Sequence, residues 1–449
     1  MSTLAAPSPS MDQTQSDAPA LSGLEAIAPQ RTNVASLPSW FVERSTAAWQ
    51  TFQDLPVPTI KDENWRYSSA KQIPLADLQP ASIANADQEK AAIAASTGLK
   101  SPAAKLIFLN DRLIHSETDA LPEGIVILPL EEALKQHSDL LEAHFMQRDH
   151  VLGSAKYAAL HLAHVQAGAV VLAKKGVELA GSIEVFHWVA GEASSIFPHT
   201  LIIAEDLAKV SVVEHYRSLD DKPGFSCAVA DFIAKPGSKI TYAQSQELNR
   251  QSVAMHLSST SADRDASVMS FQLQLGAAFA RSENVSDLVG AGSRSDMLSG
   301  SLPMGEQRVD QRTLQCHKAP HATSDLLYKN ALYDKSKTVF SGLITVDEGA
   351  HYTDAYQTCR NLLNSDDAEA DSMPGLEINA DQVKCSHGST SGPISDDELF
   401  YLKARGIPDG EARHLIVRGF LADALGRLHD EEIAELMKAR IDVKMSALS

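Results

Sequence analysis

Apolar and polar residues alternate along much of the chain after Gly168. Phe271, Leu273 and Leu275, for example, are separated by glutamines. Because successive side chains of a β-strand point to opposite faces, this period of two predicts strands with one buried face. Helix signals are few between Gly168 and about residue 395, so the pattern predicts a β region of more than 200 residues.

A short pattern repeats within this β region, in which a turn-like pair of residues is followed by an apolar residue. It occurs at Ala208-Lys209-Val210, Ser238-Lys239-Ile240, Ala266-Ser267-Val268 and Ser295-Asp296-Met297. The steps between the last residues are 30, 28 and 29. A constant step with several strands predicts coils of a parallel β-helix, each stacked on its neighbour.

A β-sandwich or barrel is the alternative to the β-helix. Such folds usually show turn signals about every 8–12 residues and hairpin dipeptides such as Asn-Gly. The β region contains no Asn-Gly dipeptide, which favours the β-helix.

Helical periodicity appears on both sides of the β region. Phe41, Ala48 and Phe52 share one helix face, and the prolines after Leu55 end that helix. Apolar strands are predicted at 105–109 and 125–129, so residues 36–150 form a mixed, largely helical domain.

The C-terminal part reads as a small helical domain. Ser395 and Glu398 form a capping-box pattern that opens a helix ending near Gly406. Further helices are predicted at 411–425 and 429–441. We therefore expect a disordered tail over 1–35, the mixed domain over 36–150, a β-helix core over 151–390 and a helical domain over 391–449.

Charge and cysteine content narrow the class of protein. The chain carries 39 Lys and Arg against 58 Asp and Glu, a formal charge of −19 that disfavours nucleic-acid binding. Its four cysteines are widely spaced, which suits a reducing compartment, and we expect a cytoplasmic protein. No apolar run approaches the ~20 residues of a membrane span, and the N-terminus lacks a signal-peptide pattern.

Common catalytic motifs are absent from the sequence, including GxxxxGK[ST], HExxH, GxSxG and GxGxxG. Several other residues could have a functional role or could simply occupy core or turn positions, which is the bland interpretation. They are His161, His164, Cys227, Cys359, Trp65 and the potential metal group Cys316, His317, His321 and His351. For all of these except Trp65, where the two interpretations are balanced, we favour the bland one.

The run Lys384-Cys385-Ser386-His387-Gly388 is the sharpest chemical signal. It lies where the β region gives way to the C-terminal helices. In an extended segment Cys385 and His387 point to the same side, and a thiolate beside an imidazole suits zinc, copper or iron–sulfur chemistry. Two such ligands alone are a weak signal.

Longer runs resemble the SufD branch of the SufB/SufD family, which belongs to the SUF iron–sulfur cluster assembly system. The similar runs are Ser324–Leu332, Thr353–Thr358, Arg360–Leu363, Ala368–Asp371, Pro374–Ile378, Val383–Gly388, Phe400–Leu402 and Arg405–Ile407, with Pro58-Thr59, Lys61, Glu63 and Trp65–Tyr67 upstream. The similarity covers most of the chain after about residue 37 and is densest over 320–410.

This resemblance implies a mainly β protein, with a right-handed parallel β-helix between helical N- and C-terminal domains. It implies two partners: SufB, which pairs through the β-helices, and the SufC ATPase, which docks on the C-terminal helices. It also implies a non-enzymatic scaffold that handles iron or a nascent cluster, in a complex linked to reduced flavin. The expected partner-interface residues are Lys384, Phe400, Tyr401, Arg405 and Gly406.

By the same resemblance His387 is a ligand for iron or a nascent cluster at the SufB interface, and Cys385 is the adjacent thiol. Lys384 is expected to favour the thiolate of Cys385. Ser365 falls where SufB has an essential cysteine, so this chain lacks that sulfur acceptor. Cys359 stands where asparagine is expected, and we interpret it as a core residue.

Two functions of other classes stay open. One is a homodimeric metal-binding module that uses Cys385 and His387 without an ATPase. The other is a carbohydrate-active β-helix enzyme with Asp325, Asp347, Glu348 or Asp354 as catalytic carboxylates, which rests on fold analogy alone.

Overall fold

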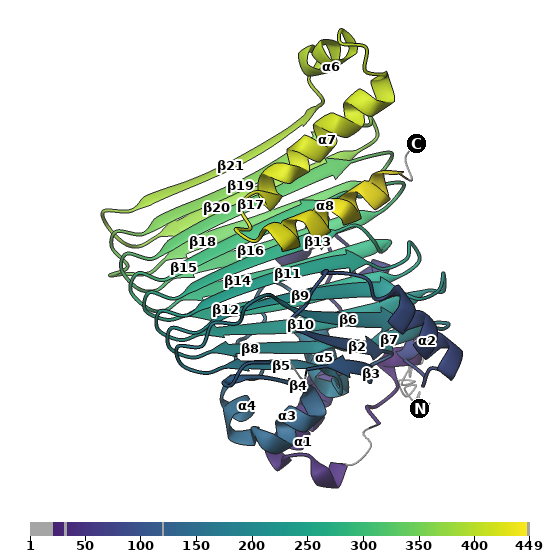
Figure 1. Cartoon of the computed structure of the whole chain (residues 1–449), viewed down its shortest axis with the longest axis vertical. Helices are drawn as coiled ribbons and strands as arrows, with labels where there is room; N and C mark the ends of the chain where they lie inside the picture. The colour runs from purple at the N-terminus through teal and green to yellow at the C-terminus, as the bar shows by residue number, and fades with distance from the viewer. Residues whose placement is uncertain (1–20, 31–33, 119–120, 447–449) are drawn as a thin grey trace, which may run out of the picture.

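Two long β-sheets form most of the molecule in the computed structural model, which describes residues 21–30, 34–118 and 121–446. The first sheet has 11 strands and the second has 10. Consecutive strands of the core lie in opposite sheets and pair in parallel with the strands one coil before and after (Figure 1). The predicted parallel β-helix is therefore confirmed.

The coils are built from strands of similar length. In the first sheet they are β5 Gly168–Ala173, β8 His199–Ala204, β10 Gly224–Ala234, β12 Val253–Ala262, β14 Phe279–Leu288, β16 Arg308–His317, β18 Lys337–Val346 and β20 Glu369–Ile378. In the second they are β6 Ile183–Val189, β9 Lys209–Ser218, β11 Lys239–Glu247, β13 Ser267–Gln274, β15 Arg294–Ser301, β17 Thr323–Leu332, β19 Asp354–Leu363 and β21 Lys384–Pro393.

The strand register tests the predicted repeat. Ile240 pairs with Val210 on one side and with Val268 on the other, as the repeat predicts. The fourth position is wrong by two residues, because Val268 pairs with Ser295 and not with Met297. A shift of two residues keeps the same face of a strand, so alternation alone does not detect it.

One corner of each coil turns through a residue with positive φ. Leu207, Gly237, Asp265, Gly292 and His321 have φ of 62°, 68°, 56°, 71° and 60°. Their N–H groups donate to carbonyls of the next coil, at 3.0, 2.8, 3.0, 3.2 and 2.9 Å. This ladder at the corner satisfies the backbone without hairpin turns, which is why the Asn-Gly signal is absent.

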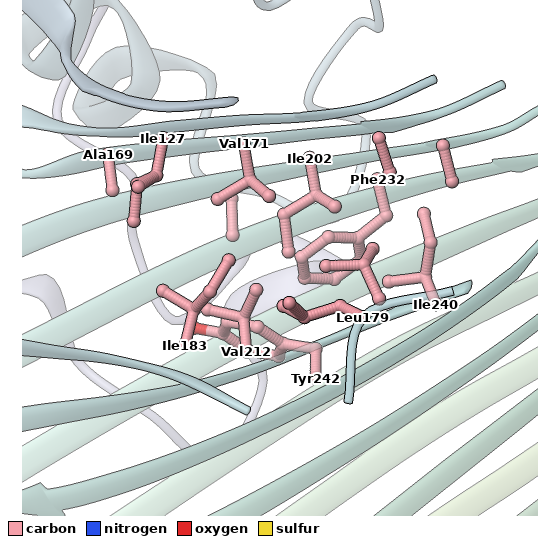
Figure 2. Close-up of a cluster of buried hydrophobic side chains, with 14 of the residues drawn as sticks. Ile127, Ala169, Val171, Leu179, Ile183, Ile202, Val212, Phe232, Ile240 and Tyr242 are labelled. Carbon is pink, nitrogen blue, oxygen red and sulfur yellow. The ribbon is translucent and has the colours of Figure 1, made fainter. Parts of the chain in front are cut away.

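The interior between the sheets changes character along the axis. Near the N-terminal coils it is apolar, and Figure 2 shows Ile202 and Phe232 from the first sheet facing Val212 and Ile240 from the second. Amide side chains fill the interior further along. Asn330, for example, donates to Asn361 Oδ1 over 2.8 Å, one coil away.

The C-terminal helices are α6 Asp396–Lys403, α7 Asp409–Leu425 and α8 Glu431–Ser446, close to the predicted ranges. Helices α7 and α8 cover the outer face of the second sheet (Figure 1). On this face Phe271 and Leu273 pack with Leu421. The start of α6 at Ser395 is confirmed, but its side chain makes no capping hydrogen bond.

The N-terminal part contains α1 Ser39–Asp54, α2 Ala86–Ala95, α3 Leu130–Gln136, α4 Ser138–His144 and α5 Ala155–His164, with short strands β1 Gln79–Pro80, β3 Arg112–Glu117 and β7 Ser194–Ile196. The predicted apolar strands are present as β2 Ala104–Leu109 and β4 Ile125–Pro129. β2 pairs with β6 and β4 with β5, so both strands extend the core sheets.

Two expected boundaries therefore shift. The first coil begins at β5 and not at residue 151, because α5 precedes it. Residues 21–30 were assigned to the disordered tail, but Leu24 is fully buried in an apolar cluster and Ser22 Oγ donates to Ala76 O over 3.1 Å. Residues 1–20 and 31–33 of that tail lie outside the described residues.

A buried ionic cluster joins the N-terminal region to the β-helix. Arg281 is 1% exposed and forms ion pairs with Glu283 and Asp310. Its guanidinium also lies 3.9 Å from the ring centroid of Trp65. Trp65 is fully buried, so the packing interpretation of this residue is the correct one.

Candidate functional site

The β-helix has an open end at its last coil. β20 and β21 are the terminal strands of their sheets, and within the described part of the chain each pairs with one neighbour (Figure 1). Every residue of β21 is exposed or half-buried, whereas β17, two coils earlier, is mostly buried. Unpaired strand edges of this kind are ready to accept another chain.

Cys385 and His387 lie on the same side of β21, as predicted, and the structure shows that this is the inner side. They pair with Ala355 and Gln357 of β19, which are 0% and 1% exposed and face the interior. His387 itself is exposed, whereas Cys385 is half-buried and packs against an apolar cluster that includes Ile344. The two potential ligands thus stand side by side at the open end.

The thiol of Cys385 is harder to ionise than an ordinary cysteine. Burial raises its pKa, and the carboxylate of Asp354 raises it further, although a backbone hydrogen bond to Ala355 opposes this. The prediction that Lys384 favours the thiolate is wrong. Lys384 lies on the outer side of the strand, opposite Asp354, because neighbouring side chains alternate.

Cys385 and His387 do not by themselves complete a metal site. Among the described residues, no group of three or more His, Cys, Asp and Glu side chains is arranged to hold a metal ion. These two side chains could supply two soft ligands, whereas a tetrahedral site needs about four. A site built on them would need further ligands from a partner or from the bound species.

Cys359 belongs to the interior, one coil below Ser389. Its Sγ donates to Asn361 Oδ1 over 3.7 Å, and burial raises its pKa to about 12. This neutral thiol fits the interpretation as a core residue. Ser365 lies in the turn after β19 and accepts a 2.7 Å hydrogen bond from Asp334 N.

The remaining histidines and cysteines do not form a common site. His317 Nε2 bonds to Ser324 Oγ over 2.8 Å, His321 stacks on Tyr352, and His351 bonds to the Asp381 carbonyl. Cys316, Cys227 and His161 are buried and hydrogen-bonded to their surroundings. His164 is also buried, and its ring packs against those of Trp49 and Phe197. The bland interpretation of these residues agrees with their surroundings.

Two of the suggested carboxylates lie near the same arginine. Asp325 forms an ion pair with Arg427, and Asp354 borders Cys385. Both carboxylates also act on the charge of Arg294. Asp347 and Glu348 lie in the turn after β18.

A second surface lies on the C-terminal helices. Phe400 and Tyr401 are 73% and 55% exposed, and the Arg405 guanidinium lies 3.4 Å from the Tyr401 ring centroid. Gly406 has φ of 84°, which ends the turn after α6. Between α6 and α7 runs a groove of about 610 Å³, lined by Leu362, Asp397, Glu398, Tyr401, Leu402, Leu415, Ile416, Gly419 and Phe420.

Two features of these surfaces are missed by sequence reasoning. Leu415 is 42% exposed and lines the groove, but it is one apolar residue among many in α7. Gln357 lies directly below His387, and only the strand register reveals this.

No helix among the described residues has the length and apolar character needed to cross a membrane.

Comparison with known proteins gives two family matches. Residues 187–420 match the model of the SUF system FeS cluster assembly SufBD core domain, and residues 33–185 match the SufBD protein N-terminal region. Together these matches include β21 with Cys385 and His387, and most of the groove between α6 and α7.

Individual proteins are similar over nearly the whole chain. The iron–sulfur cluster assembly protein SufD of Escherichia coli is 30% identical, over 90% of this chain and 93% of its own length. SufD of Bacillus subtilis is 26% identical, over 91% and 94%. The iron–sulfur cluster assembly protein SufB of B. subtilis is 25% identical, over 72% of this chain and 69% of its own length.

Proposed function

This chain belongs to the SufBD family of SUF-system iron–sulfur cluster assembly proteins, and from this premise we propose that it is a SufD-type scaffold subunit whose open β-helix end presents His387 and Cys385 to iron or a nascent cluster. The observation that carries the proposal is the position of Cys385 and His387 on the inner side of β21, a strand with one unpaired edge. Iron or the cluster is cargo in this function.

A SufB-type partner completes the site. The unpaired edges of β20 and β21 offer backbone hydrogen bonds to another β-helix end, and the partner would contribute the missing ligands. The similarity of this chain to a SufB protein supports a pairing of two related folds. Symmetric pairing of two copies of this chain is the competing arrangement, and mixing the chain with a SufB-type protein before sizing separates the two.

His387 and Cys385 have different roles in the proposed binding of metal. His387 binds iron as a neutral imidazole, and its exposure allows it to reach across the interface. Cys385 has to lose its proton when it binds metal, so its raised pKa keeps the thiol protonated until metal arrives. The apolar cluster behind Cys385 limits access of water.

The groove between α6 and α7 is the proposed site for a SufC-type ATPase. Exposed aromatic side chains such as Phe400 and Tyr401 are typical anchors of protein interfaces. ATP hydrolysis is assigned to that partner and not to this chain.

The test is His387→Ala in the complex with SufB- and SufC-type partners. After reconstitution with iron and sulfide, we expect loss of bound iron and of cluster absorbance, because packing cannot replace a lost ligand. The thermal midpoint should stay unchanged, since His387 is exposed. Ser389→Ala, at the next inner position of β21, is the matched control. Normal iron content in the His387→Ala complex would reject the proposal.

A further inference from the structure

The inner column that ends at His387 changes character one coil below it. In register, the column runs from Met297 through Leu326 and Gln357 to His387. Met297 and Leu326 are buried in an apolar cluster. An apolar residue would continue this packing, yet an amide stands directly beneath the proposed ligand.

The Gln357 amide forms a hydrogen bond through its nitrogen but not through its oxygen. Its side chain is 1% exposed, and Nε2 donates to the Gly342 carbonyl over 3.2 Å. Oε1 is buried and has no hydrogen-bond partner among the described residues. A buried oxygen without a donor is unfavourable, so a donor that reaches Oε1 would stabilise the site.

The opposite sheet leaves room for this amide. A Cβ on Gly342 would lie 2.4 Å from Gln357 Oε1 and 2.7 Å from both Thr313 Oγ1 and Phe340 Cζ, which is too close for all three atoms. The hydroxyl of Thr313 is also without a partner among the described residues. Glycine at 342 therefore keeps a small space open across from Gln357, between the Thr313 hydroxyl and the Phe340 ring.

His387 supplies the missing donor. A neutral imidazole that binds metal through one nitrogen carries N–H on the other, and that N–H normally needs an acceptor that fixes the ring. Paired strands lie about 4.8 Å apart, so side chains at paired inner positions stack within reach of each other. An amide oxygen accepts this bond without adding charge to the site.

We propose that Gln357 is a positioning residue, whose Oε1 accepts the hydrogen bond from the ring nitrogen of His387 that does not bind iron. This deepens the proposed function and rests on it. The bond forms when a partner covers β21 and orders the exposed ring of His387.

The experiment measures Fe²⁺ affinity of the complex with the SufB-type partner under anaerobic conditions, and the visible absorption bands of Co²⁺ as a probe of ligand geometry. Gln357→Leu should weaken Fe²⁺ binding about 10- to 100-fold and alter the Co²⁺ bands, because the ring loses its acceptor. Gln357→Glu keeps an acceptor oxygen but loses the donor to the Gly342 carbonyl, so it should weaken Fe²⁺ binding less than Gln357→Leu does.

Gln311→Leu is the matched control. Gln311 is also a buried inner glutamine with an unpartnered Oε1, and its Nε2 donates to Ser299 Oγ over 3.1 Å. It lies away from β21, so Fe²⁺ affinity should not change. Should Gln357→Leu fail to fold, Gly342→Ala provides a second variant, because its Cβ displaces the Gln357 amide and should produce the same loss.

Two results separate the inference from the proposed function. If His387→Ala abolishes Fe²⁺ binding while both Gln357→Leu and Gly342→Ala bind within threefold of the wild type, the positioning role is wrong and the ligand role stands. If His387→Ala binds Fe²⁺ as the wild type does, the proposed function fails and the inference falls with it.

Discussion

Cys385 and His387 are two residues apart on one strand, yet their surroundings differ. The Cys385 side packs against the buried apolar cluster that contains Ile344 and Ala355. His387 is exposed and stands above an amide. At the scale of the residue, the site therefore pairs a protonated thiol held against apolar residues with an imidazole that is free to turn.

The carboxylate of Asp354 contributes to the raised pKa of Cys385, so its removal should make the thiol more reactive. We expect Asp354→Asn to increase the rate of Cys385 alkylation by iodoacetamide at pH 7.5 by roughly two- to fivefold, because the thiolate fraction rises as the pKa falls. Mass spectrometry of the modified peptide measures this rate.

Cys359 provides an internal control in the same experiment. It is fully buried and its pKa is raised to about 12, so it should stay unmodified in the native chain. An unchanged or slower rate at Cys385 in Asp354→Asn would contradict the electrostatic role of Asp354.

At the scale of elements, the molecule has two surfaces that could bind a partner, and the two differ in chemistry. The edges of β20 and β21 offer backbone groups, which favour strand pairing. The groove between α6 and α7 offers aromatic and aliphatic side chains, which favour the insertion of apolar anchors. Each surface thus suits a different kind of partner.

Phe400 is the most exposed aromatic side chain of α6, so its truncation should affect binding and not folding. We expect Phe400→Ala to change the free energy of unfolding by less than about 0.5 kcal/mol. Its affinity for a SufC-type partner should fall at least about fivefold, as for an interface anchor worth roughly 1 kcal/mol or more. Calorimetric titration measures the affinity.

Val443→Ala is the control for this variant. Val443 is 66% exposed on α8, which contributes no residue to the groove, whereas Phe400 lies on α6 beside the groove residue Tyr401. The loss of the Val443 side chain should therefore leave partner affinity unchanged. Equal losses of affinity in the two variants would indicate a general surface effect and reject the groove as the docking site.

At the scale of the whole molecule, the β-helix buries ionisable groups along its axis. Burial raises the pKa of Glu214, but hydrogen bonds from His187, Thr200 and Tyr242 outweigh the effect of burial and hold the pKa at about 2. His256 is 3% exposed, and burial lowers its pKa to about 4. Both values lie below those of the unfolded chain.

These shifts predict that acid destabilises the fold. The unfolded chain protonates His256 near pH 6.5, whereas the folded chain does so near pH 4, so stability present above pH 6.5 is lost as the pH falls through this interval. Glu214 adds a further loss below about pH 4.5. Each group contributes up to roughly 1.4 kcal/mol per pH unit within its interval.

Urea unfolding between pH 7.5 and 5 tests this prediction. The midpoint should fall with the pH in the wild type, and His256→Gln should show a smaller fall, because glutamine has no proton to gain. The same pH dependence in the wild type and in His256→Gln would show that this histidine does not contribute.

Much of the architecture follows from the sequence alone. Alternation and a step near 29 residues predict the parallel β-helix because both reflect local rules, the period of a strand and the length of one coil. The C-terminal helices and the shared side of Cys385 and His387 follow for the same reason. Each depends on neighbours along the chain and not on distant contacts.

Tertiary structure alone decided the remaining features. The joining of β2 and β4 to the core sheets, the exact register at Met297, the raised pKa of Cys385 and the placement of Gln357 beneath His387 all depend on strands far apart in sequence. Pairing between coils brings these residues together in space. They lie about one coil apart in the sequence, so a pattern read over neighbouring residues does not detect their contact. The physical reason is that electrostatics and burial act through space, whereas periodicity reports only the face of an element.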